Sequence, residues 1–137
     1  MRWHGGGACL TKSKKIMATQ PEQLRDRTKQ FAIRIVTLFR NLPKTDEARI
    51  MGKQLLRAGT SVAANYRAVC RARSRAEFIS KIGVVVEEAD ETVFWLEMLV
   101  ETGVLPRARM EELLAEANEL LAILAASQRT ARAGGRQ

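Results

Sequence analysis

The chain has 137 residues, which is enough for one domain with a sizeable core and too few for two. Aromatic residues make up only 5% and proline occurs three times, which argues against a β-sandwich or barrel, because such folds need aromatic and β-branched strands separated by frequent turns. The formal net charge of +8 at pH 7 points to an anionic partner or surface.

The charge is distributed unevenly along the chain. Residues 1–20 carry four basic and no acidic side chains, and residues 128–137 carry three arginines. Between these ends, residues 21–81 have a net charge of +9 and residues 82–127 a net charge of −8. This polarity favours a basic face that meets phosphate or a neighbour's acidic surface, although solvated helix faces of opposite sign would give the same pattern. We predict a folded unit at 21–127 between a disordered basic N-terminal extension at 1–20 and a disordered basic tail at 128–137.

Four stripes of apolar residues, with steps of three and four, predict four α-helices joined by short connections. Pro43, Gly103 and Pro106 are typical of helix boundaries, and Thr45 and Ser74 are typical N-caps. The pattern predicts an all-α, antiparallel up-down-up-down four-helix bundle. We expect the middle two helices to have about 25 residues each and the outer two to be a turn or more shorter. The helices are expected at about 21–42, 45–71, 74–103 and 106–127.

The second predicted helix contains a run of small residues from Gly52 to Ala64. Glycine weakens a helix interior by about 1 kcal/mol relative to alanine, so such a run indicates close approach of another helix. Asn65 falls on the apolar stripe one turn after Ser61. We expect it to be buried, hydrogen-bonded and structural rather than part of a ligand site.

An unusually apolar stretch, from Val93 to Val100, lies in the third predicted helix. Its core-facing positions leave Phe94, Trp95 and Met98 on other faces of the helix. Exposed apolar patches of this kind mark interfaces, so we predict that these three residues mediate self-association. The alternative is a wide core covered by the ends of the first and last helices.

The chain offers little for catalysis. Its single histidine is His4, in the N-terminal extension, which excludes inward-facing Glu-x-x-His di-iron pairs and histidine-based acid–base chemistry. Carboxylates are dense between Glu87 and Glu119, but a solvated or salt-bridged face is favoured over a site for a hard cation. We therefore expect no enzyme activity, no catalytic residue, no cofactor and no metal.

The two cysteines, Cys9 and Cys70, form neither a disulfide framework nor a CxxC motif, which predicts a reducing cytoplasmic location. The sequence contains no run of eighteen apolar residues, so we expect no membrane span.

Two ladders of basic residues, each with a spacing of four, run along the second predicted helix. Like charges at this spacing repel by about 0.2–0.5 kcal/mol per pair, which predicts an anionic group nearby. Either nucleic-acid phosphates or the acidic helices of an adjacent subunit fit this requirement. Aromatic residues, Tyr66 excepted, do not interleave with the basic ones, so base stacking is not supported. The candidate phosphate-binding residues are Arg25, Arg27, Arg34, Arg49, Lys53, Arg57, Arg67, Arg71, Arg73 and Arg75.

The segment QLLRAGTSVAAN at 54–65, followed by RSRAEF at 73–78, resembles the four-helix bundle family of 23S rRNA intervening-sequence proteins. The pattern of that family runs Q-L-x-R-A-x-x-S-x-x-x-N, then R-S-x-x-E-F, then an acidic helix ending in a leucine-rich stretch. The resemblance covers about residues 22–125. Ala68 and Val69 depart from it, since family members often have Glu and Gly at these positions. The matching motif residues are Ser61, Asn65, Ser74, Glu77 and Phe78.

The resemblance implies an antiparallel bundle that assembles as a homopentameric ring or barrel. It also extends to the accessory variability protein of diversity-generating retroelements, a basic pentameric barrel that associates with a reverse transcriptase and nucleic acid. We expect a non-enzymatic homo-oligomer whose basic surface binds RNA or DNA, or scaffolds a nucleic-acid enzyme such as a reverse transcriptase. The alternative is a purely structural or protein-interaction ring that binds no nucleic acid.

Overall fold

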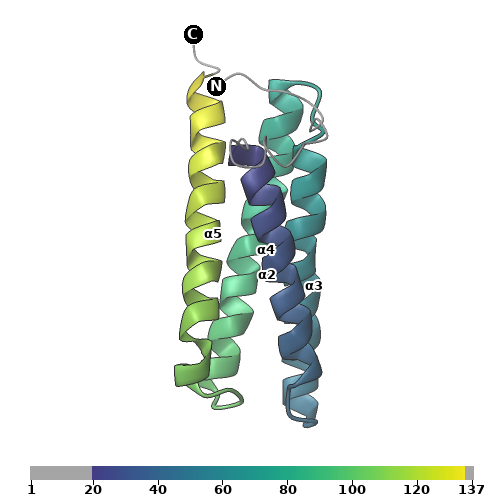
Figure 1. The fold of residues 1–137 in the computed structure, drawn as a ribbon, viewed down its shortest axis with the longest axis vertical. Coiled ribbons are helices and arrows are strands. Elements are labelled where there is room, and N and C mark those ends of the chain that lie inside the picture. The colour runs from purple at the N-terminus through teal and green to yellow at the C-terminus, as the bar shows by residue number, and fades with distance from the viewer. Residues whose placement is uncertain (1–19, 135–137) are drawn as a thin grey trace, which may run out of the picture.

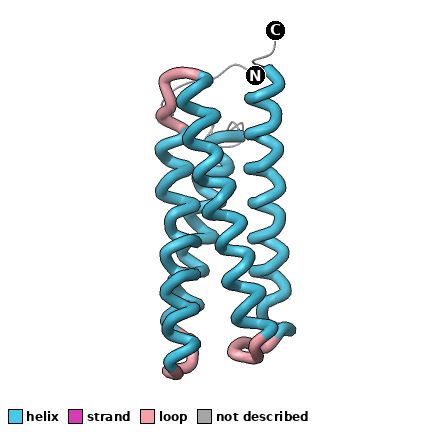
Figure 2. The backbone as a smooth tube through the Cα atoms, turned by 180° about the vertical axis from the view of Figure 1, so that it is seen from behind, coloured by secondary structure: helices cyan, strands magenta, loops and turns pink. Residues whose placement is uncertain are grey.

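The computed structural model describes residues 20–134, which form four α-helices and no strand within that range. The helices are connected in an up-down-up-down arrangement with short loops at both ends of the molecule (Figures 1 and 2). The predicted all-α four-helix bundle is therefore confirmed. Residues 1–19 of the extension predicted at 1–20, and residues 135–137 of the predicted tail, lie outside the described residues, whereas Gln20 is already the first residue of a helix. The elements are α2 (Gln20–Arg40), α3 (Asp46–Val69), α4 (Arg75–Glu101) and α5 (Arg107–Gly134).

The helix boundaries are set by capping residues that can be recognised in the sequence. The Thr45 hydroxyl accepts a hydrogen bond from the Ala48 N–H at 3.3 Å, and the Ser74 hydroxyl accepts one from the Glu77 N–H at 3.1 Å. The Glu77 carboxylate accepts from the backbone N–H of Arg73 at 3.3 Å, one residue before the N-cap position that a standard capping box uses. After α4, Gly103 adopts the left-handed conformation with φ of 80°, which glycine reaches without steric strain.

The core is formed by the predicted apolar stripes. Fully buried side chains come from every helix, including Ile35, Leu55, Ile82 and Leu120. The exception is Asn65, which is only half-buried, and Tyr66 beside it is 3% exposed. Both positions lie near the core-facing side of α3, and the larger apolar ring of Tyr66 occupies the interior because its burial removes more apolar surface from water. The expectation of a buried Asn65 is thus wrong.

The glycines of α3 allow α2 to approach closely. A Cβ atom on Gly59 would lie 3.0 Å from Cγ1 of Ile35, and one on Gly52 would collide with Cδ1 of Leu42. A Cβ atom on Gly52 would also lie 3.2 Å from Cδ1 of Phe39. Because Ile35 and Phe39 both belong to α2, both glycines lie against that helix. The predicted role of the small-residue run in close helix packing is confirmed.

The last helix is longer than the sequence pattern predicts. α5 has 28 residues, more than any other described helix, and continues to Gly134 rather than ending near residue 127. Ala131 is buried with 5% of its surface exposed, so the continuation packs onto the bundle. Residues 128–134 are therefore not a disordered tail, and the prediction of a shorter fourth helix is wrong. Packing against a neighbouring helix supplies stability that the apolar stripe alone does not indicate. None of the described helices is long and apolar enough to cross a membrane.

Candidate nucleic-acid interface

Three basic residues of α3, Arg49, Lys53 and Arg67, share one outward side of that helix, and Arg71 follows in the turn to α4. Arg49 and Lys53 are one turn apart, and Arg67 lies eighteen residues after Arg49. Eighteen residues make five turns of an α-helix, so Arg49 and Arg67 point in the same direction. All four side chains are exposed. This side of α3 carries basic charge at both ends over about 27 Å.

A shallow pocket of about 310 Å³ at the α2–α3 turn collects four cationic side chains. Arg40 ends α2, Lys44 lies in the connecting loop, and Arg49 and Lys53 lie in the first two turns of α3. We call these four residues the α2–α3 basic pocket. Within residues 20–134, none of them forms an ion pair, and no acidic residue lines the pocket.

The floor of the α2–α3 basic pocket is apolar, because Phe39, Leu42 and Pro43 complete its lining. An apolar surface beside the cations lowers the local dielectric, which strengthens their attraction for an anion and their mutual repulsion without one. The geometry is suited to a polyanion that contacts several cations at once, as the phosphates of a nucleic-acid strand do.

The sequence-based candidate set includes Arg49 and Lys53 but not Arg40 and Lys44. Arg40 and Lys44 could have been identified from the helical hairpin that the sequence predicts. Because the loop between α2 and α3 is short, the last turn of one helix lies beside the first turns of the next. Basic residues on either side of Leu42 and Pro43 are therefore brought together even though they share no helix face.

A second basic cluster surrounds the turn between α3 and α4. Its residues, Arg67, Arg71, Arg73 and Arg75, are all exposed and belong to no ion pair within residues 20–134. Arg25 of α2 lies at the same end of the bundle, since the Cys70 thiol beside this turn donates to the Pro21 carbonyl at 3.8 Å. The structure thus brings five of the predicted phosphate-binding residues to one end of the molecule, and we call the four turn residues the α3–α4 turn cluster.

Two of the predicted residues are instead engaged within the chain. The Arg27 guanidinium donates to both oxygens of Glu116, at 2.8 and 2.7 Å, and also contacts Glu119 at 2.8 Å. These contacts raise the pKa of Arg27, and those with Arg27 lower the pKa of Glu116. Arg57 pairs in the same way with two carboxylates of α4, at 3.4 Å for Glu88 and at a shorter distance for Glu91. Arg27 and Arg57 therefore tie helices together and are less available to a phosphate.

Arg34, another predicted phosphate contact, lies on a different side of α2. It lines a groove between α2 and α5 rather than the seam between α2 and α3. Its charge contributes to the lowered pKa of Glu116, which places it near the α5 carboxylates. Arg34 is therefore separate from the α2–α3 basic pocket.

Of the three predicted interface residues, only Phe94 is largely exposed, at 49%. Trp95 and Met98 are half-buried and pack against the core. The two aromatic rings meet edge to face, with centroids 4.8 Å apart and planes at 76°. The Trp95 Nε1 group is buried and has no hydrogen-bond partner within residues 20–134. The exposed apolar surface of α4 is thus narrower than the sequence suggests.

The motif residues divide into two groups. Ser74 and Glu77 bond the backbone at the start of α4, and Phe78 is buried with 4% of its surface exposed. Ser61 and Asn65 are half-buried on α3. Val69, which stands where the family often has glycine, is fully buried, and α3 continues without a break to this residue.

The carboxylates do not gather into a metal site. Within residues 20–134, no group of three or more His, Cys, Asp or Glu side chains is arranged to hold a metal ion. Four of the acidic residues considered for such a site are engaged by arginine instead: Glu88, Glu91, Glu116 and Glu119.

Comparison with known proteins assigns the chain to a family. The family model for the 23S rRNA-intervening sequence protein matches residues 22–126. The chain belongs to the 23S rRNA-intervening sequence protein family. The chain is also similar to the crystal structure of a protein of unknown function from the S23 ribosomal protein family of Bacteroides thetaiotaomicron. The two chains are 35% identical with a TM-score of 0.75, over 81% of this chain and 99% of the other. No curated protein matches the chain.

Proposed function

We propose that this protein is a non-enzymatic homopentamer that binds the sugar–phosphate backbone of nucleic acid through the outward basic side of α2 and α3. The observation that carries the proposal is the α2–α3 basic pocket, in which four cations meet without an ion pair or a lining carboxylate among the described residues. The pentameric assembly and a role beside a nucleic-acid enzyme such as a reverse transcriptase are the functions that the resemblance implies.

The spacing of the basic groups supports a long anionic ligand. The α2–α3 basic pocket and the α3–α4 turn cluster lie about 27 Å apart along α3, which corresponds to about eight base steps of a duplex at 3.4 Å each. A single strand or a duplex can therefore contact both clusters, whereas a mononucleotide can contact only one. Because these contacts go to phosphate and not to base edges, we expect little sequence preference.

The test is the salt dependence of binding to a labelled RNA duplex and a labelled DNA duplex. The full chain is compared with the variant Lys44→Gln/Lys53→Gln, which removes two charges from the pocket. The matched control is Arg129→Gln/Arg132→Gln, which removes the same charge from exposed positions near the end of α5. Using the full chain matters, since truncation at residue 127 would remove the last turns of α5.

We expect the wild-type affinity to fall steeply with salt, with a slope of about −0.9 per phosphate contact in a log–log plot. The pocket variant should bind at least about tenfold more weakly at low salt, with a slope smaller in magnitude by about 2, while the control variant keeps the wild-type slope. Equal losses in both variants would show attraction by net charge alone and refute the assignment to this pocket.

A second candidate function rests on a separate observation. α4 carries a dense set of carboxylates, of which Glu87, Asp90, Glu97 and Glu101 form no ion pair within the described residues. In a purely structural ring, basic surfaces of one subunit would meet such carboxylates on its neighbour. An oligomer that binds neither duplex would support this function over nucleic-acid binding.

A further inference from the structure

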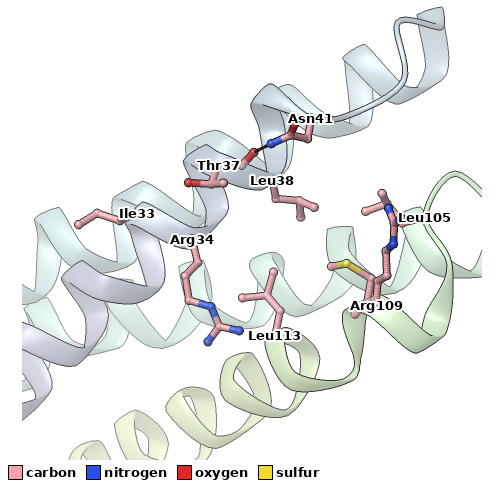
Figure 3. A pocket seen from close by; sticks show the side chains of 9 residues that line it. Ile33, Arg34, Thr37, Leu38, Asn41, Leu105, Arg109 and Leu113 are labelled. Carbon is pink, nitrogen blue, oxygen red and sulfur yellow. Dashed lines mark hydrogen bonds between the residues drawn. The ribbon is translucent and has the colours of Figure 1, made fainter.

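The bundle is open along the side where α2 and α5 face each other. The Arg27–Glu116 contacts hold these helices together near the start of α2, and toward the other end a groove of about 400 Å³ separates them. Figure 3 shows side chains of both helices facing this space. We call it the α2–α5 groove. It is lined by Ile33, Arg34, Thr37, Leu38, Asn41, Leu105, Arg109, Met110 and Leu113.

The groove combines an apolar surface with positive charge. Five of its nine lining residues are apolar, and Ile33 at its edge is 48% exposed. Arg34 and Arg109 contribute from opposite helices, no acidic residue lines the groove, and neither arginine forms an ion pair within residues 20–134. Arg34 contributes to the lowered pKa of Glu116, but Arg27 already binds this carboxylate with two hydrogen bonds. The complementary ligand is therefore an apolar group flanked by negative charges.

The outer side of α4 presents such a group. Phe94 is 49% exposed and is the only exposed aromatic residue in the described part of the chain. Neighbours on a helix surface lie three and four residues away, and acidic residues hold three of these four positions around Phe94. Two more acidic residues lie two turns away on the same side, seven residues before and after Phe94. We call Phe94 and these carboxylates the α4 knob. The acidic residues are Glu87, Asp90, Glu91, Glu97 and Glu101, of which Glu91 is already paired with Arg57 of the same chain and the other four form no ion pair within residues 20–134.

We infer that the α4 knob of one copy docks into the α2–α5 groove of a second copy, an inference that rests on the proposed homo-oligomeric assembly. Within one chain the contact is impossible, since Phe94 points away from the core that separates α4 from the groove. Residues 1–19 are a poor occupant because they carry four basic and no acidic side chains, which Arg34 and Arg109 repel.

The two surfaces differ, so the contact is heterologous rather than two-fold symmetric. Each copy keeps a free groove and a free knob after the first contact, and therefore recruits further copies. Such a contact closes into a ring when the rotation between successive copies returns to the start, and forms a filament when it does not. The knob–groove contact thus provides a physical route to the cyclic assembly proposed for this protein.

The experiment measures assembly by light scattering and mass photometry for a knob variant, Phe94→Ala, and a groove variant, Arg34→Glu/Arg109→Glu. We expect each variant alone to be monomeric under conditions where the wild-type chain is oligomeric, with the contact weakened about 30-fold or more. An equimolar mixture of the two should form a 1:1 dimer and nothing larger. The intact groove of the first variant accepts the intact knob of the second, and both remaining surfaces are disabled.

Matched controls are Val84→Ala, which removes another exposed apolar side chain from α4, and Arg129→Glu/Arg132→Glu, which makes the same charge change on α5. Both should assemble like the wild-type chain, and circular dichroism should show that all variants are folded.

Assembly of either test variant alone, or a mixture that stays monomeric, would overturn the inference and leave the proposed oligomer intact. A wild-type chain that is monomeric at every concentration would overturn both. A third outcome would assign the groove to a small amphiphile instead of a second copy. In that case decanoate would shift the NMR signals of the groove residues, and Phe94→Ala would leave assembly unaffected.

Discussion

Two glycine-to-alanine substitutions should have clearly different effects on the stability of this bundle. Both Gly59 and Gly83 lie inside helices, where alanine is favoured over glycine by about 1 kcal/mol. At Gly83, the new Cβ would meet only Nε2 of Gln128, at 3.1 Å, and the end of this flexible side chain can move. We expect Gly83→Ala to raise the free energy of unfolding by nearly the full propensity gain, about 1 kcal/mol.

At Gly59 the same methyl group would lie 3.0, 3.1 and 3.4 Å from the Cγ1, Cγ2 and Cβ atoms of Ile35. Ile35 is fully buried, and its β-branched side chain has little rotamer freedom in a helix, so it cannot move aside. Overpacking of this kind costs about 1–3 kcal/mol, which cancels or exceeds the propensity gain. Gly59→Ala should therefore be less stable than Gly83→Ala by about 1–3 kcal/mol.

The assay is urea denaturation followed by circular dichroism, with all chains at the same concentration because assembly adds to apparent stability. Since both substitutions gain the same helix propensity, the difference between them isolates the packing cost against α2. If Gly59→Ala is as stable as Gly83→Ala, then α2 and α3 are not as closely packed as the structure shows, and the reasoning fails.

Two further predictions concern titratable groups. The Arg27 guanidinium lowers the pKa of the Glu116 carboxyl group, so this group binds a proton less readily in the folded state than in the unfolded state. The ion pair therefore stabilises the folded state at neutral pH, and this stabilisation is lost as the pH falls below the ordinary pKa of 4.5. Glu116→Gln should lower the free energy of unfolding by about 1 kcal/mol at pH 7 and by much less at pH 3, as measured by urea denaturation. Equal effects at the two pH values would show that the ion pair with Arg27 is not the source of the stabilisation. Burial raises the pKa of the Cys70 thiol, which leaves little thiolate at pH 8. In a Cys9→Ser background, a disulfide reagent should therefore modify the folded chain at least about tenfold more slowly than the urea-unfolded chain, and equal rates would show that Cys70 is accessible.

Patterns within one helix were sufficient to predict the architecture of this protein. The apolar stripes, the N-caps at Thr45 and Ser74 and the glycine at 103 are each determined by neighbours in sequence, and the structure contains them as predicted. The errors arise where the outcome depends on another helix. Tyr66 rather than Asn65 is buried because of the space that the surrounding helices leave, and α5 continues past residue 127 because Ala131 packs onto the bundle.

The same distinction applies to the candidate site. The basic ladder of α3 is visible in the sequence, but the pairing of Arg57 with Glu88 and Glu91 depends on the rotation of α4 against α3. The α2–α3 basic pocket depends on how the chain turns at Leu42 and Pro43, which places Arg40 and Lys44 beside residues of the next helix. Helical spacing alone identifies neither relationship, since both join side chains from different elements.

The open side between α2 and α5 also has a consequence for how the chain folds. Because extensive packing joins each helix to the next one in sequence, while α2 and α5 touch only locally, most tertiary contacts form within helical hairpins. Only short loops have to close to form such hairpins, so little conformational entropy is lost. The relative contact order is therefore low, and folding should be fast. The first hairpin, α2 with α3, can therefore form during synthesis before α5 has left the ribosome, and the last helix completes the bundle by adding to a preformed surface on α4.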